Sequence, residues 1–137
     1  MEIYIVEDDM SVISVLQDII EDNDLGIVCG TSEGQPADVD DILAKNPDMV
    51  LIDFLMPGKD GVQVRELRER GCKAKCIMIS QVAAKELIGK AYDAGIEFFI
   101  SKPINIIEVK SVIRNVDEQI KNEKTLTNIK KMFMAEI

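Results

Sequence analysis

The segment Met49–Gly61, with the sequence MVLIDFLMPGKDG, constrains the fold of this chain most strongly. It opens with four consecutive apolar residues, a pattern typical of a strand buried on both faces in the middle of a parallel sheet. Asp53 follows this run directly, and Pro57 and Gly58 then end any regular element. Open α/β sheets hold their ligands at the carboxyl ends of strands, which favours a functional role for Asp53. On these residues alone, a role as a turn cap accounts for Asp53 equally well.

Apolar runs and amphipathic segments alternate along the whole chain. The runs with the length and composition of strands are Ile3–Val6, Gly26–Thr31, Asp48–Asp53, Lys75–Ser80 and Glu97–Ser101. Helical spacing of apolar residues occurs in Met10–Asn23, in a segment with Val39, Ile42 and Leu43 that ends near Asn46, in Val62–Arg70, in Ala83–Ala94 and from Asn105 onward. This alternation predicts an α/β fold with a doubly wound parallel sheet and right-handed crossovers.

The composition excludes several classes of function. A length of 137 residues suits one domain with a core of its own. The formal net charge of −9 argues against a nucleic-acid-binding surface, because phosphate contacts need Lys and Arg. The chain has no histidine, which excludes His-based acid–base catalysis and His-ligated metal sites within it.

The same composition predicts where the protein resides. No apolar run approaches the length of a membrane span, and the chain opens on the strand-like MEIYIV rather than on a signal peptide. Cys29, Cys72 and Cys76 form no C-x-x-C pair, and an odd count without a secretory segment indicates reduced thiols. We therefore expect a cytoplasmic protein in which Cys29 and Cys76 are small buried residues of strands.

Polar residues follow four of the five predicted strands and should meet at one edge of the sheet. Glu7 and Asp8 follow the first strand and Asp53 ends the third. Three adjacent carboxylates repel by roughly 4 kcal/mol per pair at an effective dielectric constant near 20, so the cluster either keeps a proton or binds a hard cation such as Mg²⁺. Ser80 and Lys102 end the fourth strand and follow the fifth. An acid cluster, a hydroxyl and a lysine around one carboxylate form a constellation suited to phosphoryl transfer.

These motifs resemble those of the receiver domain of bacterial two-component response regulators. They are IVEDD at Ile5–Asp9, LIDFLMPGKDG at Leu51–Gly61, MIS at Met78–Ser80 and FISKP at Phe99–Pro103, in the family's order and spacing. The resemblance implies a flavodoxin-like (βα)5 doubly wound sandwich, with a five-stranded parallel sheet of order 2-1-3-4-5.

The resemblance implies a phosphoacceptor site with a bound cation. Asp53 would take a phosphoryl group from a phosphohistidine of a sensor histidine kinase, or from a small phosphodonor. Glu7, Asp8, Asp53 and the backbone carbonyl of Leu55 would hold Mg²⁺. Asp8 has a structural alternative as the cap of the first helix, although Asp9 is the better cap.

Three further residues receive roles from the same resemblance. Lys102 would neutralise one phosphoryl oxygen, and Ser80 would hydrogen-bond another. Phe99 would turn inward when Ser80 moves, and the Lys102-Pro103 peptide bond would be cis. Taken singly, Ser80 and Lys102 could be solvated strand ends and Phe99 a plain core residue.

One position departs from the family pattern, and two others are expected to tune the site. Gln81 replaces the small residue that usually follows the hydroxyl residue, and its long amide could cover the phosphoryl site or hinder a donor. Leu55 and Val82 occupy the positions that commonly modulate hydrolysis. Because both are apolar, we hypothesise that they exclude water and prolong the life of the phosphorylated state.

Residues 1–120 are expected to form the receiver domain, because such domains end near that point. Residues 121–137 would be a helical extension: either the start of a linker to an effector domain or a dimerising helix. Two apolar stripes in this helical region are out of phase, which disfavours one uninterrupted coiled coil. The first consists of Ile106, Val109, Ile113, Val116 and Ile120, and the second of Leu126, Ile129, Met132/Phe133 and Ile137.

The implied function is a phosphorylation-dependent switch that is not an enzyme beyond its own phosphorylation and dephosphorylation. Phosphorylation would change the surface of the fourth helix, fifth strand and fifth helix to control an effector, with transcriptional output expected. One alternative is a pseudo-receiver, a protein–protein interaction module that phosphorylation does not regulate. Another is an aspartyl-phosphate phosphatase, which would need an Asp nucleophile where this chain has Glu7.

Overall fold

The computed structural model describes residues 1–35, 38–53, 62–81, 85–96 and 98–135. Its strands are β1 (Glu2–Val6), β2 (Ile27–Ser32), β3 (Met49–Asp53), β4 (Lys75–Ser80) and β5 (Phe98–Ser101). Its helices are α1 (Met10–Asp22), α2 (Asp38–Lys45), α3 (Val62–Glu69), α4 (Lys85–Ala94) and α5 (Ile106–Ala135). Strands and helices alternate as the sequence predicts, and the predicted bounds of β4 are those observed.

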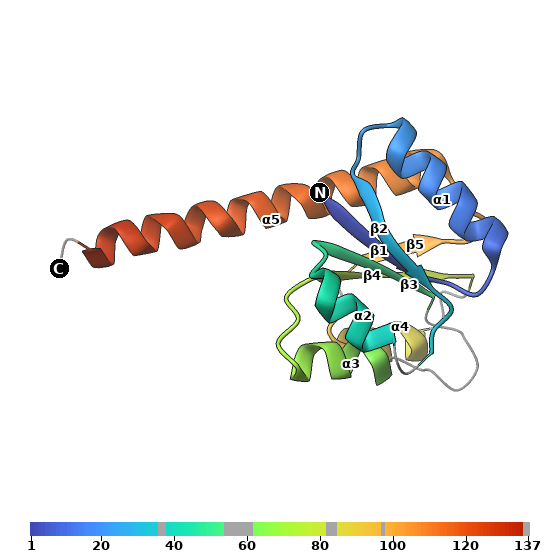
Figure 1. Ribbon diagram of the computed structural model, residues 1–137, viewed down its shortest axis with the longest axis horizontal. Coiled ribbons are helices and arrows are strands. Elements are labelled where there is room, and N and C mark those ends of the chain that lie inside the picture. The colour runs from blue at the N-terminus through green and yellow to red at the C-terminus, as the bar shows by residue number, and fades with distance from the viewer. Residues whose placement is uncertain (36–37, 54–61, 82–84, 97, 136–137) are drawn as a thin grey trace.

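The five strands form one parallel sheet. Its order is β2-β1-β3-β4-β5, which confirms the predicted doubly wound topology. Helices α1 and α5 cover one face of the sheet, and α2, α3 and α4 cover the other (Figure 1). This arrangement buries β3, the central strand, along its entire length, as its continuous apolar run requires.

Alternate side chains of each strand feed two separate cores. Ile3 and Ile5 of β1 pack with Leu16 of α1 and Ile113 of α5, on one face of the sheet. Tyr4 and Val6 point to the other face, where residues of α2, α3 and α4 surround them. The sheet is therefore held from both sides, which leaves its two ends as the places where loops can build a site.

Capping residues mark the start of α1 and the ends of α3 and α4 near the positions that the sequence predicts. Asp9 is the N-cap of α1, and its Oδ1 accepts the backbone N–H of Ser11 at 2.9 Å. Asp9, rather than Asp8, therefore takes the capping role. Gly71 and Gly95 follow α3 and α4 with φ of 85° and 100°, the left-handed backbone that favours glycine after a helix.

Helix α5 is a single helix of 30 residues that runs well past the body of the molecule (Figure 1). Val109, Ile113 and Val116 are buried against the sheet, whereas Ile106, at the start of the predicted apolar stripe, is 47% exposed. Each described residue after Ile120 is exposed. The change of phase between the two apolar stripes thus falls where the helix leaves the body, and it does not interrupt the helix.

The three cysteines are free thiols that differ in burial. Cys72 and Cys76 are buried. Cys29, which the sequence predicts to be buried, is only half-buried, because it lies in the edge strand β2. Burial raises the pKa of the Cys76 thiol to about 11. Within the described part of the chain, no helix has the length and apolar content that a membrane span requires.

Candidate functional site: an acidic cluster at the carboxyl edge of the sheet

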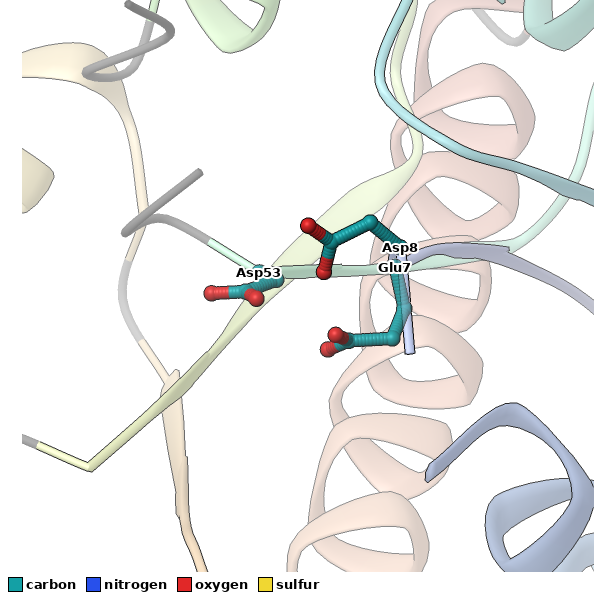
Figure 2. Close-up of side chains that lie close together, drawn as sticks. All are labelled: Glu7, Asp8 and Asp53. Carbon is teal, nitrogen blue, oxygen red and sulfur yellow. The ribbon is translucent and has the colours of Figure 1, made fainter. Parts of the chain in front are cut away.

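The carboxyl ends of β1 and β3 bring three carboxylates together. β1 and β3 are neighbours in parallel register, with Val6 opposite Ile52, so the residues that follow both strands lie side by side. Figure 2 shows the carboxylates of Glu7, Asp8 and Asp53 converging on one region. One oxygen of each carboxylate lies within 4.8 Å of an oxygen of the other two.

The cluster has a buried floor and an open rim. Glu7 is fully buried and Asp53 is 8% exposed, whereas Asp8 is exposed. A small ion or a phosphoryl donor can therefore approach from the side of Asp8. Burial lowers the local dielectric constant, which strengthens every charge interaction at Glu7 and Asp53.

Lys102 supplies a cation to this cluster. Its Nζ lies 3.0 Å from Oε2 of Glu7 and 3.3 Å from Oδ2 of Asp53. Its backbone N–H donates to the carbonyl of Ser80 at 3.0 Å, which fixes where the side chain starts. Burial lowers the pKa of Lys102, but its contact with the carboxylate of Glu7 and the negative charge of Asp53 outweigh it and raise the pKa above its ordinary value. Lys102 therefore stays protonated at neutral pH.

Glu7 carries the largest electrostatic cost in the cluster. Burial raises its pKa to about 7, against the opposing effect of Lys102, and the negative charge of Asp53 adds to the rise. Its Oε1 accepts the N–H of Asp9 at 3.2 Å. Among the described residues, its buried Oε2 has the ion pair with Lys102 but no hydrogen bond of good geometry.

These residues fit a bound Mg²⁺. Three ionised carboxylates and one ammonium leave a net charge of −2, which one divalent cation neutralises. Mg²⁺ takes few protein oxygens and keeps several waters, and a cluster with an open rim provides for both. The buried oxygen of Glu7 that lacks a hydrogen bond gives a further reason for a cation there. Leu55, whose carbonyl is the fourth expected ligand, lies outside the described residues.

Ser80, Gln81 and the Lys102-Pro103 peptide bond lie around the same edge of the sheet. Ser80 is buried at the end of β4, and its register partner on β5 is Ser101, the residue before Lys102. Gln81 follows Ser80 and is exposed. The Lys102-Pro103 peptide bond is cis, as the resemblance predicts. Val82 lies outside the described residues.

Phe99 lies further down β5, next to a helix. It is half-buried and packs against the core beneath α2, α3 and α4. Its ring meets that of Tyr92 on α4 edge to face, with centroids 5.6 Å apart and an interplanar angle of 64°. The side chain thus has a core contact on one side and an exposed aromatic partner on the other.

Two contacts of the site were not predicted from the sequence. The pairing of Lys102 with Glu7 is one of them. The other is Glu108 in the first turn of α5, whose carboxylate accepts the backbone N–H and the hydroxyl of Ser101, the latter at 2.9 and 3.1 Å. Asn105 caps α5 and Glu108 stands three residues later, the spacing of a capping box, so the sequence does carry a signal for Glu108. The structure uses that carboxylate to tie α5 to the end of β5.

Comparison with known proteins identifies the family. The model of the response regulator receiver domain matches residues 3–114. Over 127 residues, the chain is 43% identical to the transcriptional regulatory protein GlnL of Bacillus subtilis, covering 92% of this chain and 40% of GlnL. It is 30% identical to the chemotaxis protein CheY of B. subtilis, covering 81% of this chain and 92% of CheY.

Two further matches show that the chain spans only part of a longer relative and that its fold resembles that of a solved receiver domain. The chain spans 58% of the transcriptional regulatory protein DesR of B. subtilis, with 30% identity over 85% of this chain. The solved receiver domain of a modulated diguanylate cyclase from Desulfovibrio desulfuricans G20 superposes with a TM-score of 0.78 at 21% identity, covering 89% of this chain and 97% of that one. That likeness is one of fold. With the family match over most of the chain, the close relatives and the topology in agreement, the chain belongs to the response regulator receiver domain family of two-component signalling systems.

Proposed function

We propose that this chain is a phosphorylation-dependent signalling switch in which Asp53 accepts a phosphoryl group from a sensor histidine kinase. The observation that carries the proposal is the convergence of Glu7, Asp8, Asp53 and Lys102 at the carboxyl edge of the sheet. In a receiver domain this is the arrangement that phosphoryl transfer requires: a nucleophilic carboxylate surrounded by groups that offset charge.

Asp53 is the nucleophile in this proposal. One of its carboxylate oxygens forms a bond to phosphorus while the bond from phosphorus to the histidine nitrogen of the kinase breaks, and the leaving imidazole takes up a proton. Lys102 already contacts Oδ2 of Asp53 at 3.3 Å, so its ammonium stands where negative charge accumulates. Ser80, at the end of the neighbouring strand, offers a hydroxyl to a phosphoryl oxygen.

Glu7, Asp8 and Asp53 are the residues that would hold Mg²⁺, with the carbonyl of Leu55 as the fourth ligand that the family resemblance implies. When bound, the ion supplies positive charge that offsets the charge of the phosphoryl group. Lys102 balances only one of the three carboxylates of the cluster, so it leaves room for this second source of positive charge.

The signal would leave the site through Ser80 and Phe99. In our proposal both side chains rearrange after transfer, and the surface formed by α4, β5 and α5 changes its affinity for a partner. The edge-to-face contact of Phe99 with Tyr92 links the site to α4 and is the contact that this change would alter. The phosphoryl group must favour one arrangement energetically for the switch to operate.

The output and partners are inferred from relatives and from α5. GlnL and DesR are named as transcriptional regulatory proteins, which supports transcriptional control through an effector domain or a downstream protein. We propose that 1–120 is the receiver domain and that 121–137 connects it to an effector or pairs with a second copy in a homodimer. The net charge of −9 supports a chain that makes no direct nucleic-acid contact.

The experiment that tests the proposal is the intact mass of the protein after incubation with acetyl phosphate, with Mg²⁺ and with a chelator. We expect one added phosphoryl group with Mg²⁺ and none with the chelator. The adduct should disappear in Asp53→Ala and persist in Asp18→Ala, which removes an exposed carboxylate of α1 outside the cluster. No adduct in the unaltered protein would favour the pseudo-receiver instead, and an adduct in Asp53→Ala would mean that another residue is the nucleophile.

A further inference from the structure

A groove lies at the opposite end of the sheet from the acidic cluster. It has a volume of about 620 Å³ and lies between α5 and the amino ends of β3 and β4. Asp48 and Lys75 line its wall on the body, and Lys124 and Lys131 line its wall on the exposed part of α5. Its volume is within the range of small-molecule sites.

The groove concentrates positive charge in a chain that is strongly acidic. Four lysines line it, namely Lys73, Lys75, Lys124 and Lys131, against two carboxylates, Asp48 and Glu123. The chain as a whole has a net charge of −9, so this local excess of cations runs against its overall composition.

Both carboxylates of the groove already have partners. Glu123 pairs with Lys75, with 2.8 Å between Oε1 and Nζ. Asp48 accepts the backbone N–H of Glu2 at 2.8 Å through its Oδ2. Within the part of the chain that the structure describes, Lys73, Lys124 and Lys131 have no ion pair. Three ammonium groups around one recess thus remain for an outside anion.

Beyond Ile120, helix α5 does not present its exposed apolar side chains to the groove. With 3.6 residues per turn, Lys124, Thr127 and Lys131 share one side of the helix. Leu126, Ile129 and Phe133 lie on the opposite side and are 44–67% exposed. The helix therefore presents polar and cationic groups to the body and turns its apolar stripe away.

We propose that this groove binds a small linear polyanion of the di- or triphosphate class. Lys124 and Lys131 are seven residues apart, about 10 Å along the helix axis at 1.5 Å per residue, so one phosphate cannot easily reach both. A chain of phosphates can contact these lysines on α5 and Lys73 on the body at once. Lysine ammonium groups bind phosphate as point charges, which suits a flexible anion.

Such a ligand would also influence the exposed part of α5. It contacts the body through Lys73 and the helix through Lys124 and Lys131, so it holds the helix against the body. The ion pair of Lys75 with Glu123 is the one direct ion pair between these two parts among the described residues. Because Glu123 is exposed and Lys75 only half-buried, that pair contributes little by itself, and a bound polyanion adds to it.

The test is an NMR titration with inorganic triphosphate at fixed ionic strength, in the absence of Mg²⁺. The amide signals of Lys73 and Asn128 should shift, because both residues line the groove. Affinity should fall about tenfold or more in the double variant Lys73→Ala/Lys131→Ala. The control Lys90→Ala/Lys130→Ala loses the same charge from exposed positions outside the groove and should change the affinity less than about twofold.

Three results would overturn the inference. Equal weakening in the two double variants would mean that net charge alone governs binding. Triphosphate-induced shifts that spread over the whole surface, or the absence of any shift, would show that the groove is not a specific binding site. A parallel titration with citrate that binds as tightly as triphosphate would contradict the phosphate class. Circular dichroism of both variants checks that they are folded, as expected because all four lysines are exposed.

Discussion

The buried position of Glu7 disfavours its charged form, which the proposed Mg²⁺ site requires. Glu7 is fully buried beside Asp53, and its pKa is raised to about 7 chiefly by burial. In the absence of a metal, the folded protein therefore keeps a proton on Glu7 between about pH 4.5 and pH 7, where the unfolded chain releases it. Ionising Glu7 costs free energy in the folded protein, and a cation bound to the ionised cluster would offset that cost.

This leads to a prediction for pH. Because the folded pKa lies above the ordinary value of 4.5, the stability contributed by protonated Glu7 is fully present below that value and is lost as the pH rises through about 7. The melting temperature of the metal-free protein should fall over this window. Glu7→Gln, which stays neutral, should flatten the fall, and Mg²⁺ should raise the melting temperature of the unaltered protein most at the alkaline end.

Thermal unfolding followed by circular dichroism, in chelator and in Mg²⁺, checks this prediction. Repulsion among the other acidic groups of the chain also changes with pH, so the comparison with Glu7→Gln isolates the contribution of Glu7. If both proteins lose stability equally over the window, Glu7 does not hold the proton.

Gln81 allows a second prediction at the level of a single side chain. It is exposed directly after Ser80, at the edge where a phosphodonor must enter. If its amide hinders that approach, Gln81→Ala should accelerate phosphorylation by acetyl phosphate several-fold without changing the melting temperature. Rates from intact mass against time measure this, with Gln17→Ala on α1 as the matched control. An unchanged or slower rate would contradict the hypothesis that Gln81 covers the site.

The contact between Glu7 and Lys102 could not be predicted from the sequence, although the position of both residues could. The strand ends predict that Glu7, Asp8, Asp53, Ser80 and Lys102 share an edge, because parallel strands all end there. They do not predict that Lys102, which reaches from β5 past β4 to Asp53, also pairs with Glu7. That contact depends on the path of a long flexible side chain, which no local pattern encodes.

At the scale of elements, α5 combines two regions with different environments. Up to Val116 it contributes buried residues to the core, and beyond Ile120 its described residues are all exposed. Apolar spacing predicted the helix and its start near Asn105 correctly. The change of phase argues only against one uninterrupted coiled coil. The helix itself continues through it, because backbone hydrogen bonds within a helix do not depend on which face is apolar.

A truncation tests the proposed domain boundary. A chain that ends after Ile120 loses no buried residue among those described. It loses two ion pairs near the surface, Lys75 with Glu123 and Asp117 with Lys121, which together contribute at most about 1 kcal/mol. Its melting temperature should therefore fall by less than about 5 °C. A chain that ends after Asn115 also loses buried Val116 and half-buried Ile120, and it should fall several times further.

Scanning calorimetry of the two truncated proteins and the full chain decides this prediction. A large loss on removal of 121–137 alone would show that the extension is part of the folded unit. Equal melting temperatures for both truncations would place the boundary before Val116.

At the scale of the whole molecule, the two ends of the sheet differ in charge. The carboxyl edge gathers Glu7, Asp8 and Asp53, and the amino edge beside α5 gathers lysines. The doubly wound parallel sheet could be predicted from the strand–helix alternation, and its strand order followed from the family resemblance. The lysine groove could not, because Lys73 and Lys131 are brought together only by the direction in which α5 leaves the body.

The most direct measurement locates the phosphoryl group itself. After incubation with acetyl phosphate and Mg²⁺, treatment with borohydride reduces an aspartyl phosphate to homoserine, and peptide mass spectrometry then identifies the altered position. We predict homoserine at position 53 and unmodified Asp at positions 8 and 9. Homoserine at another position, or none in a protein that has gained a phosphoryl group, would contradict Asp53 as the phosphoacceptor.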